Sequence, residues 1–158
     1  MNTLNIVVPG VPESQGSARA FVVAGKARIT TSNKKLTSWR RDAIVAVREA
    51  MREQNWERVE QCSIEAEFVF PRPQSHYGSG SNAGQLKPNA PSAKTTKPDI
   101  DKLIRAVLDA LDGAGLYQGD ERVVQITCRK RYVHQGEGPR AVVAVIVAGG
   151  HLILRRAA

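Results

Sequence analysis

Aspartates crowd into one short part of this chain. Five of its six aspartates fall within residues 99 to 120, in a protein whose formal charge is +8. Two of them, Asp99 and Asp101, stand in the sequence KPDID, where the proline favours an extended backbone that points alternate side chains to one side. Two such carboxylates repel each other unless a cation lies between them, and Mg²⁺ or Mn²⁺ prefers oxygen ligands of this kind. The spacing therefore points to a divalent metal site.

A helix cap is the alternative role for this pair, because a helix is expected from Lys102 and aspartate is common at helix N-termini. A third carboxylate that reached the pair would favour metal binding. Asp120 is the candidate, since the eight residues that end at Asp120 span up to ~26 Å when extended, whereas the helix rises ~16 Å. The connection is therefore long enough to bring the three carboxylates together.

Two other aspartates of the group are expected to lie outside the site. Asp109 stands four residues after Arg105, so the two can pair on the helix surface. Asp112 lies at the expected end of the helix, beside Gly113. The candidate metal ligands are therefore Asp99, Asp101 and Asp120.

Basic residues flank these carboxylates in the sequence, namely Lys97, Lys102, Arg105, Arg129 and Arg131. Phosphodiester cleavage needs this mixture, because metal ions activate a water and bind the scissile phosphate, while Lys and Arg neutralise the neighbouring phosphates. The alternative for the run at 129 to 131 is one solvated face of a strand. Together with the net charge, the pattern favours a polyanionic partner.

The elements that must position these residues follow from the spacing of apolar side chains. Strands are predicted at 4–8, 62–70, 123–133 and 140–147, with a hairpin at 21–29. Helices are predicted from an N-cap at Ser32 or Asn33 to about 51, and from Lys102 to Leu111 with Gly113 as the C-cap. Because the strands come in sequence-adjacent groups, the predicted fold is α+β, a mixed and largely antiparallel sheet packed with two main helices.

The length of 158 residues predicts one domain over 1–158. Residues 71–97 are rich in Gly and Pro and have no apolar period, so we expect a long flexible loop within that domain. The most apolar tract, 141–154, is interrupted by glycines and is too short for a membrane span. Cys62 and Cys128 stand too far apart for a CxxC metal site. A cytoplasmic protein with no membrane partner is expected.

The aspartate-bearing segments resemble those of RusA-type Holliday junction resolvases. The run KPDIDKLIRAVLDAL at 97–111 is similar to that family's KPDxDNLxKxxxDAL segment, and GDERVV at 119–124 is similar to its later DDxxV segment. The resemblance implies a RusA-like fold and a homodimeric, Mg²⁺-dependent endodeoxyribonuclease, with Mn²⁺ as a substitute. Such an enzyme resolves four-way DNA junctions in recombination and repair by paired symmetric nicks, and has no small-molecule substrate.

The family's three catalytic aspartates match Asp99, Asp101 and Asp120. The chain departs from the family pattern at three positions: Lys102 stands where Asn is usual, Arg105 replaces a helix lysine implicated in activity, and Gly119 replaces the first aspartate of the later pair. Arg105 keeps the positive charge but does not readily donate a proton. The predicted catalytic residues are the three aspartates and Arg105, and the predicted DNA contacts are Lys97, Lys102, Arg105, Arg129 and Arg131.

Two other functions remain open from the sequence. The departures at Lys102, Arg105 and Gly119 leave room for a protein of the same fold that binds branched DNA without cutting it. The net charge of +8 on its own would also suit a small basic RNA-binding protein.

Overall fold

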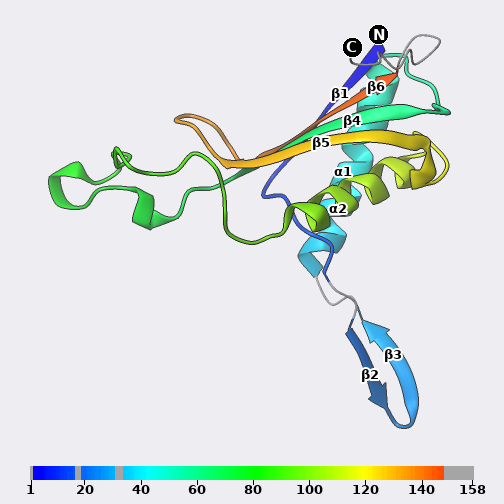
Figure 1. Ribbon diagram of the computed structural model, residues 1–158, viewed down its shortest axis with the longest axis horizontal. Helices are drawn as coiled ribbons and strands as arrows, with labels where there is room; N and C mark the ends of the chain where they lie inside the picture. Colours follow the sequence, from blue (N-terminus) through cyan, green and yellow to red (C-terminus); the bar gives the residue numbers. More distant parts are fainter. Residues whose placement is uncertain (1, 17–18, 31–33, 148–158) are drawn as a thin grey trace, which may run out of the picture.

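The computed structural model describes residues 2–16, 19–30 and 34–147 and contains a four-stranded sheet with two long helices (Figure 1). The sheet order is β1-β6-β4-β5, formed by β1 (Asn2–Pro9), β6 (Arg140–Val147), β4 (Cys62–Phe70) and β5 (Val123–Tyr132). Strand β6 pairs antiparallel with both β1 and β4, whereas β4 and β5 are parallel. A separate hairpin is formed by β2 (Arg19–Val23) and β3 (Lys26–Thr30). The predicted α+β fold with a mixed sheet is confirmed.

The core lies between the sheet and the two helices, α1 (Lys34–Glu53) and α2 (Ile100–Ala114). Alternate residues of each strand face the helices, as the period of two requires, and the helices present apolar positions at three- and four-residue intervals. The side chains buried there include Leu4, Ile6, Ile64, Phe68, Val143 and Val145 of the sheet and Trp39, Val47, Leu103, Val107 and Leu111 of the helices.

The parallel pairing of β4 with β5 determines where helix α2 lies. Parallel strands cannot be joined by a tight turn, so the chain crosses back over the sheet between them, and α2 is part of that crossover. The residue before the helix, Asp99, therefore lies near the end of β5, where Lys130 contacts the same loop. Asp120, which directly precedes β5, lies at the start of that strand.

Helix α2 is longer than predicted at both ends. It begins at Ile100, and Gly113 lies inside it rather than at its C-cap. The cap is Gly115, whose φ of 88° is a left-handed conformation that suits glycine, and whose N–H bonds the Asp112 carbonyl at 2.9 Å. The predicted N-cap residues Ser32 and Asn33, and the apolar tract beyond residue 147, lie outside the described residues.

Residues 71–97, called the arm below, project from the sheet (Figure 1). The arm contains two short 3₁₀ turns, η1 (Gln74–His76) and η2 (Gly80–Asn82), and its two sides are joined by backbone hydrogen bonds such as Gly78 to Gln85 at 2.9 Å. Its predicted flexibility stays a prediction. Among the helices of the described residues, none is both long and apolar enough to cross a membrane.

Candidate active site

Asp99 and Asp101 lie together at the first turn of α2. Asp99 is the N-cap residue and Asp101 is in the first turn, so the predicted extended backbone through this pair is wrong from Ile100 onward. Asp99 has the position of the N-cap, but its carboxylate does not cap the helix. The carboxylate makes no hydrogen bond to a backbone N–H of the first turn and instead pairs with the Lys102 ammonium at 3.1 Å. Both carboxylates are exposed, at the end of the helix where the peptide dipole favours negative charge.

A hollow of about 410 Å³ opens beside Asp99. Three lysines line it, Lys94, Lys97 and Lys102, and the connection after β1 contributes Glu13. That connection is tied to α2 by a hydrogen bond from the Gln15 N–H to the Lys102 carbonyl at 3.1 Å. Carboxylates beside a lysine-lined hollow can accept a cation together with a phosphate group. Sequence reasoning missed Glu13, because no local pattern marks a residue that reaches the site only through the tertiary fold.

Lys130 holds the loop that carries the aspartates. Its ammonium group donates to the Thr96 carbonyl at 2.8 Å and to the Pro98 carbonyl at 2.7 Å. The Lys97–Pro98 peptide bond between these two contacts is cis. Lys130 thus acts through the backbone next to Asp99, as a positioning residue that the sequence analysis did not assign to the site.

Asp120 lies at the opposite end of α2 from this pair. The Gly119 N–H donates to the Asp112 carboxylate at 3.1 Å, which places the turn before β5 against the end of the helix. The helix rises ~17 Å over the eleven residue steps from Asp101 to Asp112. Partial burial raises the pKa of Asp120, and the negative charges of Asp109, Asp112 and Glu121 raise it further.

The predicted convergence of the three aspartates is therefore not seen within one chain. Among the described residues, no three acidic, histidine or cysteine side chains lie close enough together to hold a metal ion. The connection is long enough to return to the helix start, but its residues instead form the turn at Gly115 and the 3₁₀ turn η3 (Asp120–Arg122).

The Gly119 departure from the family pattern has a structural basis. Its φ of 88° is a backbone conformation that residues with a Cβ rarely adopt. An aspartate would be strained in this turn. The backbone conformation at position 119 therefore favours glycine over the aspartate of the family pattern.

Asp109 pairs with Arg40 of α1 at 2.8 Å, so the predicted pairing of Asp109 with Arg105 is wrong. The reason is that α1 packs along α2 and offers a partner from another element. Arg105 is exposed on the surface of α2. It lies one helical turn from Asp101, where its guanidinium can reach a phosphate near the aspartate pair.

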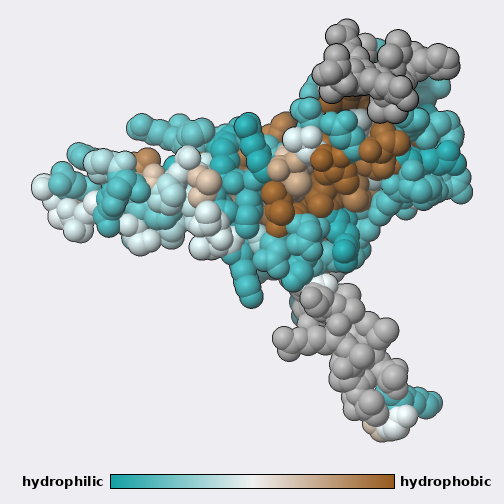
Figure 2. All heavy atoms as spheres, viewed as in Figure 1, coloured by the Kyte–Doolittle hydropathy of each residue, from teal (hydrophilic) through white to brown (hydrophobic). Residues whose placement is uncertain are grey.

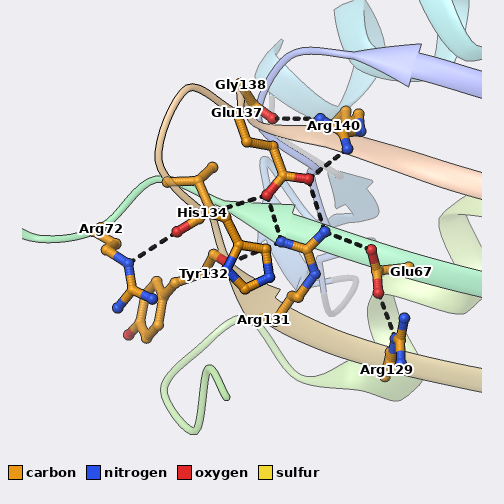
Figure 3. Close-up of polar contacts among 10 residues, drawn as sticks. Glu67, Arg72, Arg129, Arg131, Tyr132, His134, Glu137, Gly138 and Arg140 are labelled. Atoms are coloured by element: carbon orange, nitrogen blue, oxygen red, sulfur yellow. Dashed lines mark hydrogen bonds and ion pairs between the residues drawn. The ribbon is translucent and has the colours of Figure 1, made fainter. Parts of the chain in front are cut away.

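Arg129 and Arg131 both contact Glu67, but their exposure differs sharply (Figure 3). The Arg131 side chain is only 17% exposed, and it bonds Glu67 at 2.8 Å and Glu137 at 2.6 Å. Arg140 also pairs with Glu137. Hydrogen bonds from Arg131 are the main cause that lowers the pKa of both glutamates. The Arg129 side chain is 77% exposed and so presents its guanidinium to solvent.

An apolar strip separates the two carboxylate positions on the surface. Val124 and Ile126 of β5 are 52% and 42% exposed, and Ile104 and Leu108 of α2 are only partly buried. Figure 2 shows hydrophobic residues gathered in one patch over the region where Figure 1 places β5 and α2. These four residues, called the apolar strip below, form a surface whose hydrophobicity is typical of an interface.

The family model of the endodeoxyribonuclease RusA matches residues 9–146, which is most of the chain and includes all three candidate aspartates. No curated protein matches the sequence.

Proposed function

Because the chain belongs to the RusA family of endodeoxyribonucleases, we propose that it resolves four-way DNA junctions by paired symmetric nicks. Family membership makes it an enzyme that hydrolyses phosphodiester bonds in DNA. The observation that carries the finer proposal is the exposed pair Asp99 and Asp101, of which Asp99 lines a hollow together with three lysines. This is the combination of charges that cleavage of a polyanionic backbone requires.

The donor set of the aspartate pair fits a divalent cation. Asp99 and Asp101 would hold Mg²⁺, or Mn²⁺ in its place, since both prefer carboxylate oxygens. A bound ion supplies positive charge for the phosphate and lowers the pKa of a water. Two carboxylates are a sparse ligand set, which is the reason to look for Asp120 outside the single chain.

The chain's own cations would position and neutralise the DNA. Lys97 and Lys102 lie at the hollow, and Arg105 is exposed one turn along the helix. As water attacks phosphorus in line, negative charge grows on the phosphoryl oxygens, and these side chains offset it. Arg129 is exposed at the edge strand and would contact a flanking phosphate. Arg131 remains among the proposed DNA contacts, although its ion pairs with Glu67 and Glu137 make stabilisation of the fold its larger role.

A homodimer would bring the third aspartate to the pair. If two copies of α2 lie antiparallel about a two-fold axis, the start of one helix meets the end of the other. Asp99 and Asp101 of one subunit then lie beside Asp120 of the partner subunit. The apolar strip lies between the two ends and would be covered in such a dimer.

The same arrangement suits the substrate. A two-fold axis through the middle of α2 generates two equivalent composite sites, one at each end of the helix pair. A four-way junction offers two symmetry-related strands, so two such sites can nick both. The proposed symmetry of the cuts thus follows from the symmetry of the dimer.

Synthetic four-way junctions incubated with the protein and Mg²⁺ test the function. We expect paired nicks that a chelator abolishes and that Asp101→Asn removes, because the variant keeps the size of the side chain but loses its charge. Asp42→Asn is the control, since Asp42 is an exposed aspartate of α1 away from the site. The variant Asp101→Asn should still retain the junction in a gel.

The same experiment separates the other two functions. The Lys102 ammonium already neutralises Asp99, which favours the non-cleaving branched-DNA-binding protein as the second candidate. Retention of the junction with uncut strands in every metal tested would support that binder and contradict the nuclease proposal. Equal affinity for structured RNA would instead favour an RNA-binding protein.

A further inference from the structure

We propose that the arm and residues 133–139 together bind a nucleobase that has left its pair at the exchange point of the junction. Residues 133–139, the β5–β6 loop, project in the same direction as the arm (Figure 1). Between the two segments lies a hollow of about 530 Å³, a volume within the range of pockets that take small ligands. The inference rests on the proposed function, because it assigns this hollow to the same DNA substrate.

The walls of the hollow provide flat and apolar contact surface. Tyr77 and Leu86 are paired across the arm by an antiparallel bridge, and both line the hollow. Leu86 is 48% exposed, which is high for a large apolar side chain. An aromatic ring beside an aliphatic side chain is how proteins receive an unstacked base.

The hollow also offers unused hydrogen-bonding groups. The side-chain amides of Gln85 and Gln135 line it and have no hydrogen-bond partner within the described part of the chain. Each amide provides both donors and an acceptor, which matches the mixed edges of a base. The charged groups of the lining are already engaged: Arg72 bonds the Val133 and Pro91 carbonyls, and Glu137 is held by Arg131.

The charge of the arm suits DNA. Residues 68 to 98 contain no Asp or Glu and carry four Lys or Arg residues. Glu137, which lines the hollow, is neutralised by Arg131 and Arg140. A phosphate backbone can therefore lie along the arm without meeting an unpaired negative charge.

The leg of the arm that leads back to Asp99 is anchored to the sheet. The Tyr132 N–H donates to the Ser92 carbonyl at 2.9 Å, and the Lys94 ammonium lies over the rings of Phe70 and Tyr132 at 5.0 and 5.4 Å. The same leg of the arm continues to the loop that Lys130 holds beside Asp99. A base captured in the hollow would thus set which phosphate reaches the aspartate pair.

Binding to two junctions tests the site, one fully paired and one with an unpaired nucleotide at the exchange point. Extruding a base costs least when it is already unpaired, so the wild-type protein should bind the second junction more tightly. Tyr77→Ala with Leu86→Ala should remove that preference, a loss of about fivefold or more. Tyr77→Phe keeps the ring and should retain it, and Ser81→Ala, an exposed position of η2, serves as the matched control.

A photo-crosslink locates the base directly. 5-Iododeoxyuridine placed at the exchange point should crosslink to a peptide of the arm or the β5–β6 loop, whereas the same probe placed a full turn into a duplex arm should not. If the wild-type protein binds and nicks the junction but shows neither the preference nor this crosslink, the inference is overturned while the proposed function stands. If it binds no junction at all, both are overturned.

Discussion

The Gly119 N–H donates to the Asp112 carboxylate, and this 3.1 Å contact places Asp120 at the end of α2 that lies farthest from Asp99 and Asp101. One chain thus presents its candidate ligands at both ends of a 15-residue helix. Whether the three aspartates form one active site therefore depends on how two chains assemble.

Mixed dimers of Asp101→Asn and Asp120→Asn subunits should regain activity that neither variant has alone. In a composite site, one of the two sites of the mixed dimer receives both substitutions and the other receives none. In an equimolar mixture that is unfolded and refolded together, about half of the dimers are mixed and each has one intact site, so we expect single-strand nicking of the junction from about a quarter of the wild-type number of active sites. Mixed dimers as inactive as either parent, with dimer formation verified by light scattering, would show that each site lies within one subunit.

Lys102→Gln should lower the Mg²⁺ concentration needed for half-maximal nicking. The Lys102 ammonium pairs with Asp99 at 3.1 Å and so competes with a cation for that carboxylate. Both side chains are partly exposed, and an ion pair of this kind is worth at most about 1 kcal/mol, which corresponds to a shift of up to about fivefold. A titration of nicking rate against Mg²⁺ measures it, with Lys35→Gln at the start of α1 as the control. An increased Mg²⁺ requirement would contradict this expectation and show that the loss of the Lys102 charge at the phosphate outweighs the release of Asp99.

The salt dependence of junction binding should separate the exposed cations from the largely buried Arg131. Lys97→Ala, Arg105→Ala and Arg129→Ala should each weaken binding and reduce the slope of log K against log salt by about one, as expected for a lost phosphate contact. Arg131→Ala should lower the melting temperature, because it leaves Glu67 and Glu137 without their main partner. A normal slope for all three exposed variants would place the DNA on another surface.

Glu137→Gln should lower stability at neutral pH by about 1–3 kcal/mol, because it weakens the contact to a largely buried guanidinium. The pKa values of Glu137 and Glu67 are lowered in the folded protein, mainly by hydrogen bonds from Arg131. Their contribution is therefore complete above the unfolded-state pKa of about 4.3 and is lost as the pH falls toward the lower folded-state values.

Urea unfolding between pH 7 and pH 3 measures this effect. The wild-type protein should lose stability more steeply below pH 5 than Glu137→Gln does. Glu60→Gln is the matched control, since Glu60 also pairs with an arginine but its side chain is 77% exposed. Parallel pH profiles for the wild type and Glu137→Gln would contradict the assigned role.

Local patterns predicted most of the fold. The alternation in 62–70 and the helical spacing after Lys102 identified β4 and α2, because each buries one face against a single core. The family resemblance located the aspartate segments, and the match over residues 9–146 confirms it. What the sequence could not provide was the path between segments. The loop before Asp120 was long enough to reach Asp99, but the left-handed turns at Gly115 and Gly119 direct it elsewhere.

Contacts between distant segments were also beyond local patterns. Asp109 was assigned to Arg105 on its own helix, yet Arg40 from α1 is its partner. The charge run at 129–131 is typical of one basic face, but Arg131 pairs with Glu67, 64 positions away in the sequence, and with Glu137 in the loop that follows β5. Which charged side chains meet across the sheet depends on the register between neighbouring strands. The hydrophobic pattern shows which residues of a strand face the core, but not how that strand aligns with the next one.

The arm leaves the sheet after Phe70 and rejoins it at Ser92, and Lys130 holds the chain beyond that point. Changes in the length of the tip are therefore absorbed before they reach the aspartates. Such a layout separates the proposed recognition module in the arm from the proposed cutting centre at Asp99 and Asp101. It marks residues 78–85 as a place where segments from other nucleases can be grafted to retarget the enzyme without rebuilding its chemistry.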